Sequence, residues 1–207
     1  SGIGGRMQAL YFTNDSLGGI DGTTQVPSSY VHAEYDDGYK FVGIPGVVHG
    51  LIKLHESKGN LTLQQLLKPS IQLANNGFEL TRGNVIRLNM AASHVQNNSK
   101  TDKYFLGDSL FQIGDTLIQK DLANVLHEIS KYGIDGFYGG WVAEKIAKDM
   151  NRYGGYVTLD DLRDYKSVNS VVVNGELGKY SIHSLFLPSF GPIAVSYTHL
   201  RAHETDR

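Results

Sequence analysis

The chain has 207 residues, of which 41% are hydrophobic and 19% charged, the composition of an ordinary globular protein with room for a core. Its net charge of -2, with both signs interspersed, offers no basic surface for nucleic acid or an anionic membrane, so no nucleic-acid partner is expected. The absence of cysteine excludes disulfides, thiolate catalysis and cysteine metal sites, but assigns no compartment. Because the chain opens at Ser1 without an initiator Met, we expect it to be cut from a longer protein.

The first part of the chain predicts a strand, a loop and then a helix. Residues 7–13 alternate weakly and predict a strand, and the turn-rich residues 14–22 predict a loop. A helical pattern starts at Pro45, since proline suits a first helical position, and Gly59 is expected to stop it. The predicted apolar face of this helix consists of Val47, Val48, Leu51, Ile52 and His55.

A second helix is predicted from a capping box. Thr62 and Gln65 have the spacing at which a side chain and a backbone N–H cap each other reciprocally. Pro69 falls inside the apolar pattern that follows, so we expect a break or kink there, and an end at Gly77.

Further helices follow in the middle of the chain. A helix is predicted around residues 85–92, and the polar stretch 96–103 is expected to be exposed. Two clean apolar stripes then end at Gly133 and at the pair Gly154 and Gly155. The stripes consist of Leu122, Val125, Leu126 and Ile129, and of Val142, Ala143, Ile146, Ala147 and Met150.

The last elements are a short helix and a hairpin. Thr158 and Asp161 predict a capped helix. Beyond Ser170 the apolar run predicts two strands around a turn at Asn174 and Gly175, because an Asn-Gly pair is a strong hairpin signal.

Three segments in the middle of the chain contain residues that helix formation alone does not require. Helices need apolar spacing and caps, yet these phrases also fix prolines and glycines in a set order. They are FVGIPGVVHGL from Phe41, LLKPSIQLANNGFELT from Leu66, and DLANVLHEISKYGIDGFYGGWVAEKIAKDMNRYGGYVTLDDLRDY from Asp121. Together with SGIGG at residues 1–5 and LPSFGP at residues 187–192, they resemble the large subunit of the gamma-glutamyltransferase family.

The resemblance implies an α+β fold, the four-layer αββα sandwich of N-terminal nucleophile hydrolases, incomplete in this mostly helical chain. It implies that residues 1–195 are part of a large subunit. Such enzymes cleave themselves so that a threonine starts a small subunit, and its freed amine serves as the base. The threonine attacks a gamma-glutamyl amide, as in glutathione, and the acyl group passes to water or to an acceptor amine.

Several expectations about partners follow from the same resemblance. The implied partners are a small-molecule gamma-glutamyl substrate, an acceptor, and a small subunit that carries the catalytic threonine. No cofactor or metal is implied, and no catalytic residue is expected in this chain. The resemblance also implies a periplasmic or extracellular location.

The expected substrate-binding residues are Thr23 and Thr24. Aligning Asp21 and Pro27 with an aspartate and a proline of the family places Thr23 and Thr24 where the family has arginine and glutamate. That arginine grips the substrate α-carboxylate, a task suited to a bidentate guanidinium. A threonine hydroxyl donates one hydrogen bond and carries no charge. Threonine at this position therefore calls into question whether the enzyme selects gamma-glutamyl substrates. Arg6 is a further departure, because it stands in the glycine-rich opening.

Some apparent motifs have a plainer explanation. Residues 196–207 resemble a translated sequencing adapter, so we interpret them as a non-native tail. Thr198 mimics the family's nucleophile phrase, and His199 with His203 has the helical spacing of two zinc ligands, but both lie in that tail. A chain-terminal Ser1 resembles a nucleophile, although SGIGG matches an internal phrase of the family.

Two other functions fit the residues. The same fold can act as an acylase on another amide, such as a cephalosporin-type side chain or a peptide amide, which Thr23 would favour. A non-catalytic helical binding module is the alternative from a different class, and it would require these residues to form a complete domain.

Overall fold

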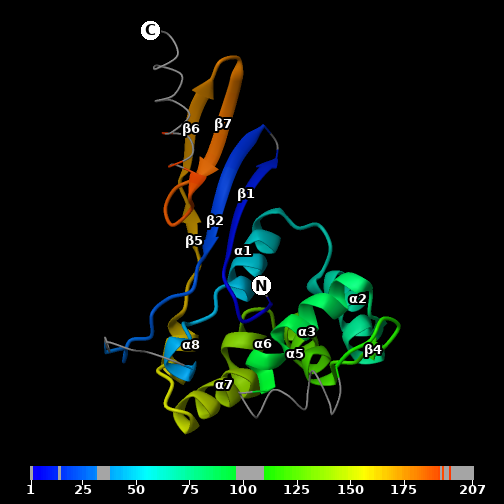
Figure 1. The fold of residues 1–207 in the computed structure, drawn as a ribbon. Coiled ribbons are helices and arrows are strands. Elements are labelled where there is room, and N and C mark those ends of the chain that lie inside the picture. The colour runs from blue at the N-terminus through cyan, green and yellow to red at the C-terminus, as the bar shows by residue number, and fades with distance from the viewer. Residues whose placement is uncertain are drawn as a thin grey trace. The chain divides into compact units, whose positions relative to one another are not determined.

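The computed structural model describes residues 2–13, 15–31, 38–96, 110–191, 193 and 196 (Figure 1). The chain divides into two compact units, one formed by residues 1–60 and 137–207 and the other by residues 61–136. Helices and strands both occur among the described residues, so the predicted α+β class is confirmed. The proposed tail boundary at residue 195 stays a prediction, because of residues 196–207 only Ser196 is described.

The first unit contains a three-stranded antiparallel sheet in the order β1-β2-β5. Strand β1 (Met7–Thr13) confirms the prediction for these residues, and β5 (Val168–Ser170) pairs with the far edge of β2 (Ser16–Gly22). The loop predicted over residues 14–22 is therefore wrong. Its glycines suggested a turn, but Gly18 pairs with Tyr11 in the β1–β2 ladder, where the Tyr11 ring occupies the space that a Cβ would take.

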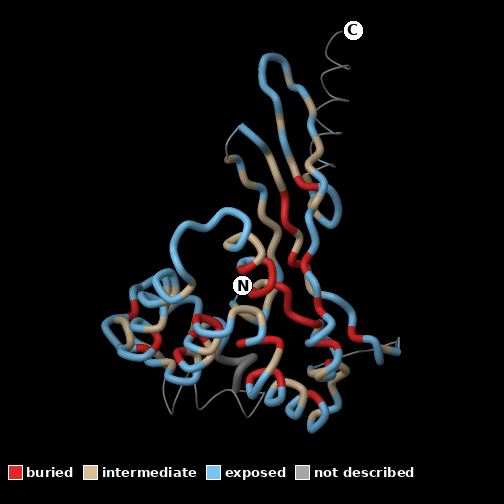
Figure 2. Tube along the Cα trace, turned by 180° about the vertical axis from the view of Figure 1, so that it is seen from behind, coloured by how far each residue is buried: buried red, intermediate tan, exposed pale blue. Residues whose placement is uncertain are grey.

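Helix α1 (Val47–Lys58) packs closely on this sheet. A Cβ at Gly46 would collide with the carbonyl oxygen of Gly22, and a Cβ at Gly50 would lie 2.9 Å from the sulfur of Met7. Small residues on both elements thus let the two backbones approach, and Figure 2 shows buried stretches along both β2 and α1.

The predicted limits and face of α1 need two corrections. The helix begins at Val47 with Gly46 as N-cap, so Pro45 precedes the helix and does not open it, while Gly59 ends it as predicted. Val48 and Ile52 are buried as predicted, but Leu51 is 52% exposed. The buried positions of this helix are Val48, His49, Gly50 and Ile52.

A β-hairpin follows β5 in the same unit. It consists of β6 (Val172–Leu177) and β7 (Tyr180–Leu185), and it lies beside β1 and β2 (Figure 1). The predicted turn at Asn174 and Gly175 is wrong, because both residues pair within β6. The turn lies at Gly178, whose φ of 60° is a left-handed conformation that glycine adopts without strain. Leu185 packs against Gly19 of β2.

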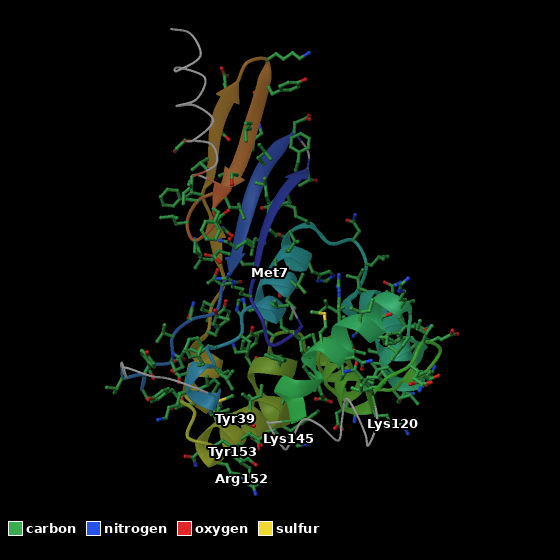
Figure 3. All side chains as sticks on the ribbon, in the orientation of Figure 1. Met7, Tyr39, Lys120, Lys145, Arg152 and Tyr153 are labelled. Carbon is green, nitrogen blue, oxygen red and sulfur yellow. The ribbon has the colours of Figure 1, made fainter. Side chains whose placement is uncertain are left out.

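The remaining helices of the first unit support the segment that precedes α1. They are the single turn η1 (Gly38–Phe41), α7 (Gly140–Arg152) and α8 (Leu159–Asp164), and the short α6 (Asp135–Tyr138) opens this part of the chain. Val142, Ala143 and Met150 of the predicted α7 stripe are buried. The rings of Tyr39 and Tyr153, labelled in Figure 3, pack with centroids 4.7 Å apart.

The second unit is built on two packed helices, α2 (Leu63–Asn76) and α5 (Lys120–Tyr132), and it also contains α3 (Arg82–Gln96) and a two-stranded sheet. That sheet pairs β3 (Phe78–Glu79) with β4 (Thr116–Leu117). The capping box at Thr62 and the ends at Gly77 and Gly133 are confirmed. Of the break or kink predicted at Pro69, the break does not occur, because α2 continues through the proline, and the kink stays a prediction. Most of residues 96–103 lie outside the described part of the chain.

Candidate substrate pocket

Thr23 follows the last residue of β2, and both of its backbone polar groups are held in place. Its N–H donates to the carboxylate of Asp21 at 2.8 Å, and its carbonyl accepts from the hydroxyl of Tyr165 at 2.8 Å. Burial, with a smaller contribution from the charge of Asp21, raises the pKa of Tyr165 to about 12, so this phenol stays protonated and remains a donor. The backbone at Thr23 is therefore fixed from two sides.

Tyr165 belongs to a buried aromatic cluster that includes Tyr138 and His49. The rings of Tyr138 and Tyr165 stack with centroids 5.4 Å apart, and His49 meets each ring edge-on. The hydroxyl of Tyr138 donates to the carbonyl of Pro45 at 2.7 Å and accepts the backbone N–H of His49 at 3.2 Å. This network links the start of α1 to the residue that holds Thr23.

His49 also forms a pair with Ser167 that resembles a catalytic dyad. Its Nδ1 lies 2.7 Å from the Oγ of Ser167, with 118 positions between them in the sequence. The two residues are only 6% and 5% exposed, and burial, then the charge of Lys166, lowers the pKa of His49. A hydroxyl that no substrate reaches cannot serve as a nucleophile, so the pair is structural. Sequence reasoning missed it because no local spacing connects the two residues.

A pocket of about 290 Å³ opens where β1 begins and β2 ends, next to the loop after β7. It is lined by Arg6, Met7, Gln8, Thr23, Pro188, Ser189 and Phe190. Figure 3 labels Met7 at the start of β1. Within the described residues, Nε2 of Gln8 and Oγ1 of Thr23 are buried without a hydrogen-bond partner. Such orphan groups cost about 1 to 3 kcal/mol each, so they mark a place where a ligand or another chain segment can bind.

Thr24 lines a separate pocket, also of about 290 Å³. This pocket is lined by Thr24, Gln25, Val26, Pro27, Tyr30, Lys40, Phe41, Val42 and Gly43. Val26 and Phe41 are more than two-thirds exposed, at 71% and 78%. The two site residues expected from the sequence are thus neighbours in the chain but line different pockets.

Asp161 holds the segment that follows Thr24. Its carboxylate accepts the backbone N–H of Ser28 at 2.9 Å and caps α8 through the hydroxyl of Thr158 at 2.7 Å. Burial opposes ionisation, but the hydrogen bonds from Ser28 and Thr158 outweigh it and hold the pKa of Asp161 at about 2. The carboxylate that completes the capping box predicted for α8 therefore also holds the backbone at Ser28.

Among the described residues, no cluster of three or more His, Asp or Glu side chains could hold a metal ion. In the same part of the chain, none of the helices has the length and apolar character needed to cross a membrane. Ser1, Thr198, His199 and His203 lie outside the described residues.

Known proteins of one enzyme class resemble this chain in fold and in sequence. The crystal structure of Helicobacter pylori gamma-glutamyltranspeptidase superposes with a TM-score of 0.87 at 33% identity, covering 91% of this chain and 58% of that one. The fold is that of the N-terminal nucleophile hydrolases, as the resemblance predicted. The family model described as "Gamma-glutamyltranspeptidase" matches residues 1–203. The chain belongs to the gamma-glutamyltranspeptidase family.

Curated relatives agree with this assignment. The glutathione hydrolase proenzyme of Pseudomonas sp. (strain A14) is 38% identical over 160 residues, which are 76% of this chain and 28% of that protein. The capsule biosynthesis protein CapD proenzyme of Bacillus anthracis is 32% identical over 193 residues, or 92% of this chain and 34% of the relative. This chain thus spans about a third or less of the relatives' length.

Proposed function

We propose that this chain is part of an enzyme that transfers or hydrolyses gamma-glutamyl groups of glutathione-type amides through a threonine acyl-enzyme. The observation that carries the proposal is the polar pocket at Thr23, in a chain whose sequence matches the family over residues 1–203. The nucleophilic threonine is supplied by a small subunit outside these residues, and this chain supplies part of the substrate pocket.

The proposed chemistry assigns a binding role to the pocket. The threonine hydroxyl attacks the gamma-glutamyl carbonyl, its proton passes to the threonine's own amine, and the leaving amine departs as the acyl-enzyme forms. Water or an acceptor amine then takes the acyl group. Because Thr23 stands at the position of the family's arginine, its pocket receives the α-carboxyl end of the donor. Thr24, at the position of the family's glutamate, lines the neighbouring pocket.

An acylase acting on another amide is the second candidate, and the neutral side chain of Thr23 favours it. A substrate without an α-carboxylate needs no cation at this position. The fold is compatible, because the cephalosporin acylase of Bacillus halodurans superposes with a TM-score of 0.82 at 23% identity, a likeness that concerns the fold alone.

Turnover by the full-length enzyme that contains this segment distinguishes the two candidates. We expect gamma-glutamyl-p-nitroanilide to be hydrolysed faster than butyryl-p-nitroanilide, which lacks the α-amino and α-carboxylate groups. Intact-mass spectrometry after rapid quenching should show one gamma-glutamyl adduct on the small subunit. Preference for the butyryl amide would favour the acylase, and the absence of any acyl adduct with either substrate would contradict both.

A further inference from the structure

Arg6 is the cationic residue of the pocket that Thr23 lines. It immediately precedes β1, and its backbone neighbours are anchored. The carbonyl of Gly5 accepts two N–H groups at the start of α1, from Gly46 at 2.9 Å and from Val47 at 3.1 Å. On its other side, Met7 pairs with Gly22 at the end of β2. The root of the Arg6 side chain is therefore held at the pocket although its side chain is exposed.

Neutral donors surround the same pocket. Gln8 contributes an amide group and Thr23 a hydroxyl, and both are orphaned within the described residues. The Oγ of Ser189 accepts the N–H of Gly191 at 3.2 Å, a bond that does not use the hydroxyl hydrogen. One carboxylate oxygen of Asp21 accepts the backbone N–H of Thr23, and Asp21 is not among the residues that line the pocket. One guanidinium with several neutral donors is a set that matches a carboxylate.

We propose that Arg6 determines the specificity of this pocket for a carboxylate, supplying from the start of β1 the positive charge that Thr23 lacks. The inference rests on the proposed function, in which this pocket receives the α-carboxyl end of a gamma-glutamyl donor. The cation is relocated from the end of β2 to the residue before β1, and both positions border the same pocket. Gln8 and Thr23 complete the site as neutral donors.

The exchange of positions can be tested by a double-mutant cycle in the full-length enzyme containing this segment. The variants are Arg6→Gly, Thr23→Arg and the two together. The measured quantity is the ratio of kcat/KM for gamma-glutamyl-p-nitroanilide to kcat/KM for 4-aminobutyryl-p-nitroanilide, which keeps the amine but lacks the α-carboxylate. Arg6→Gly should lower this ratio about tenfold, the difference between a charge-assisted and a neutral hydrogen bond. Thr23→Arg should restore it in the Arg6→Gly background, which makes the two positions strongly non-additive.

Two further variants separate charge from folding. Arg6→Lys should keep part of the ratio, because the charge remains while the bidentate geometry is lost. Arg163→Gln is the matched control, since Arg163 is 57% exposed and forms its ion pair with Asp160 on the surface of α8. A ratio that is unchanged in Arg6→Gly, or lowered equally by Arg163→Gln, would overturn the inference.

A binding measurement keeps the inference testable if the proposed function fails. Should neither anilide be turned over, L-glutamate is titrated by calorimetry into the same wild-type enzyme and its Arg6→Gly variant. Binding that weakens about tenfold in Arg6→Gly supports Arg6 as the carboxylate ligand. Equal binding by the two proteins, or no detectable binding by either, refutes it.

Discussion

At the scale of single residues, hydrogen bonds hold the backbone of Thr23, whereas its hydroxyl has no hydrogen-bond partner among the described residues. The Tyr165 hydroxyl and the Asp21 carboxylate fix its carbonyl and its N–H. The sequence alone made Thr23 a candidate site residue, because Asp21 and Pro27 frame its position. It could not identify Tyr165 as the partner, because 142 positions separate the two residues and no local pattern records a contact of that range.

We expect Tyr165→Phe to destabilise the chain by about 1 to 2 kcal/mol, because the partly buried carbonyl of Thr23 loses its hydrogen bond and its desolvation is no longer compensated. Chemical denaturation measures the free energy of unfolding. Hydrogen exchange at the amides of Thr24 and Gln25 should also accelerate if the bond positions this segment. Tyr180→Phe serves as the control, since Tyr180 is 64% exposed. Equal effects of the two substitutions would show that the Tyr165 hydroxyl has no such role.

Asp161 should make the stability of the chain depend on pH. Its pKa is lowered from 3.8 to about 2 in the folded state, so its stabilising contribution is fully present above 3.8 and is lost as the pH falls towards 2. A shift of this size corresponds to about 2 kcal/mol. The free energy of unfolding, measured between pH 5 and pH 2, should therefore decline less steeply for Asp161→Asn than for the wild type. Parallel curves would refute the assignment.

At the scale of elements, the predictions from capping boxes succeeded, whereas the turn signals at Gly18 and at Asn174 and Gly175 failed because these residues pair within strands. The capping boxes at Thr62 and Thr158 formed as predicted, because each satisfies backbone N–H groups within one turn. Gly18 suggested a loop but lies in β2 beneath Tyr11. Of the break or kink predicted at Pro69, the break does not occur, because α2 continues through the proline. This helix also packs against α5, a contact that the sequence pattern does not show.

Close contact between α1 and β2 predicts a strong effect of Gly46→Ala. The added Cβ would meet the carbonyl oxygen of Gly22 and the hydroxyl of Tyr165, and neither can move without disturbing the sheet or the pocket. We expect a loss of about 1 to 3 kcal/mol in the free energy of unfolding. Gly4→Ala is the control, because nothing lies within 4 Å of a Cβ at that position. A Gly46→Ala variant as stable as Gly4→Ala would contradict this close packing.

At the scale of the whole molecule, the sequence predicted the family through residues that helices and strands do not require. The prolines and glycines of the three phrases identified the family that the comparisons confirm, whereas composition and charge fit any globular protein. The geometry of the pocket could not be predicted from the sequence, because it depends on three separate segments, namely the start of β1, the end of β2 and the loop after β7.

The proposal assigns pocket residues to this chain and the nucleophile to a small subunit, and it therefore predicts how the 207-residue polypeptide behaves on its own. We expect no turnover of gamma-glutamyl-p-nitroanilide and no acyl adduct, because this chain contributes pocket residues while the nucleophilic threonine belongs to the small subunit. The absorbance of released p-nitroaniline and intact-mass spectrometry measure the two outcomes. Ser1→Ala and Thr198→Ala are the decisive variants, since these residues are the two nucleophile mimics in the sequence. Turnover by the wild-type polypeptide that either substitution abolishes would place the nucleophile within this chain, and the role assigned to the small subunit would then be wrong.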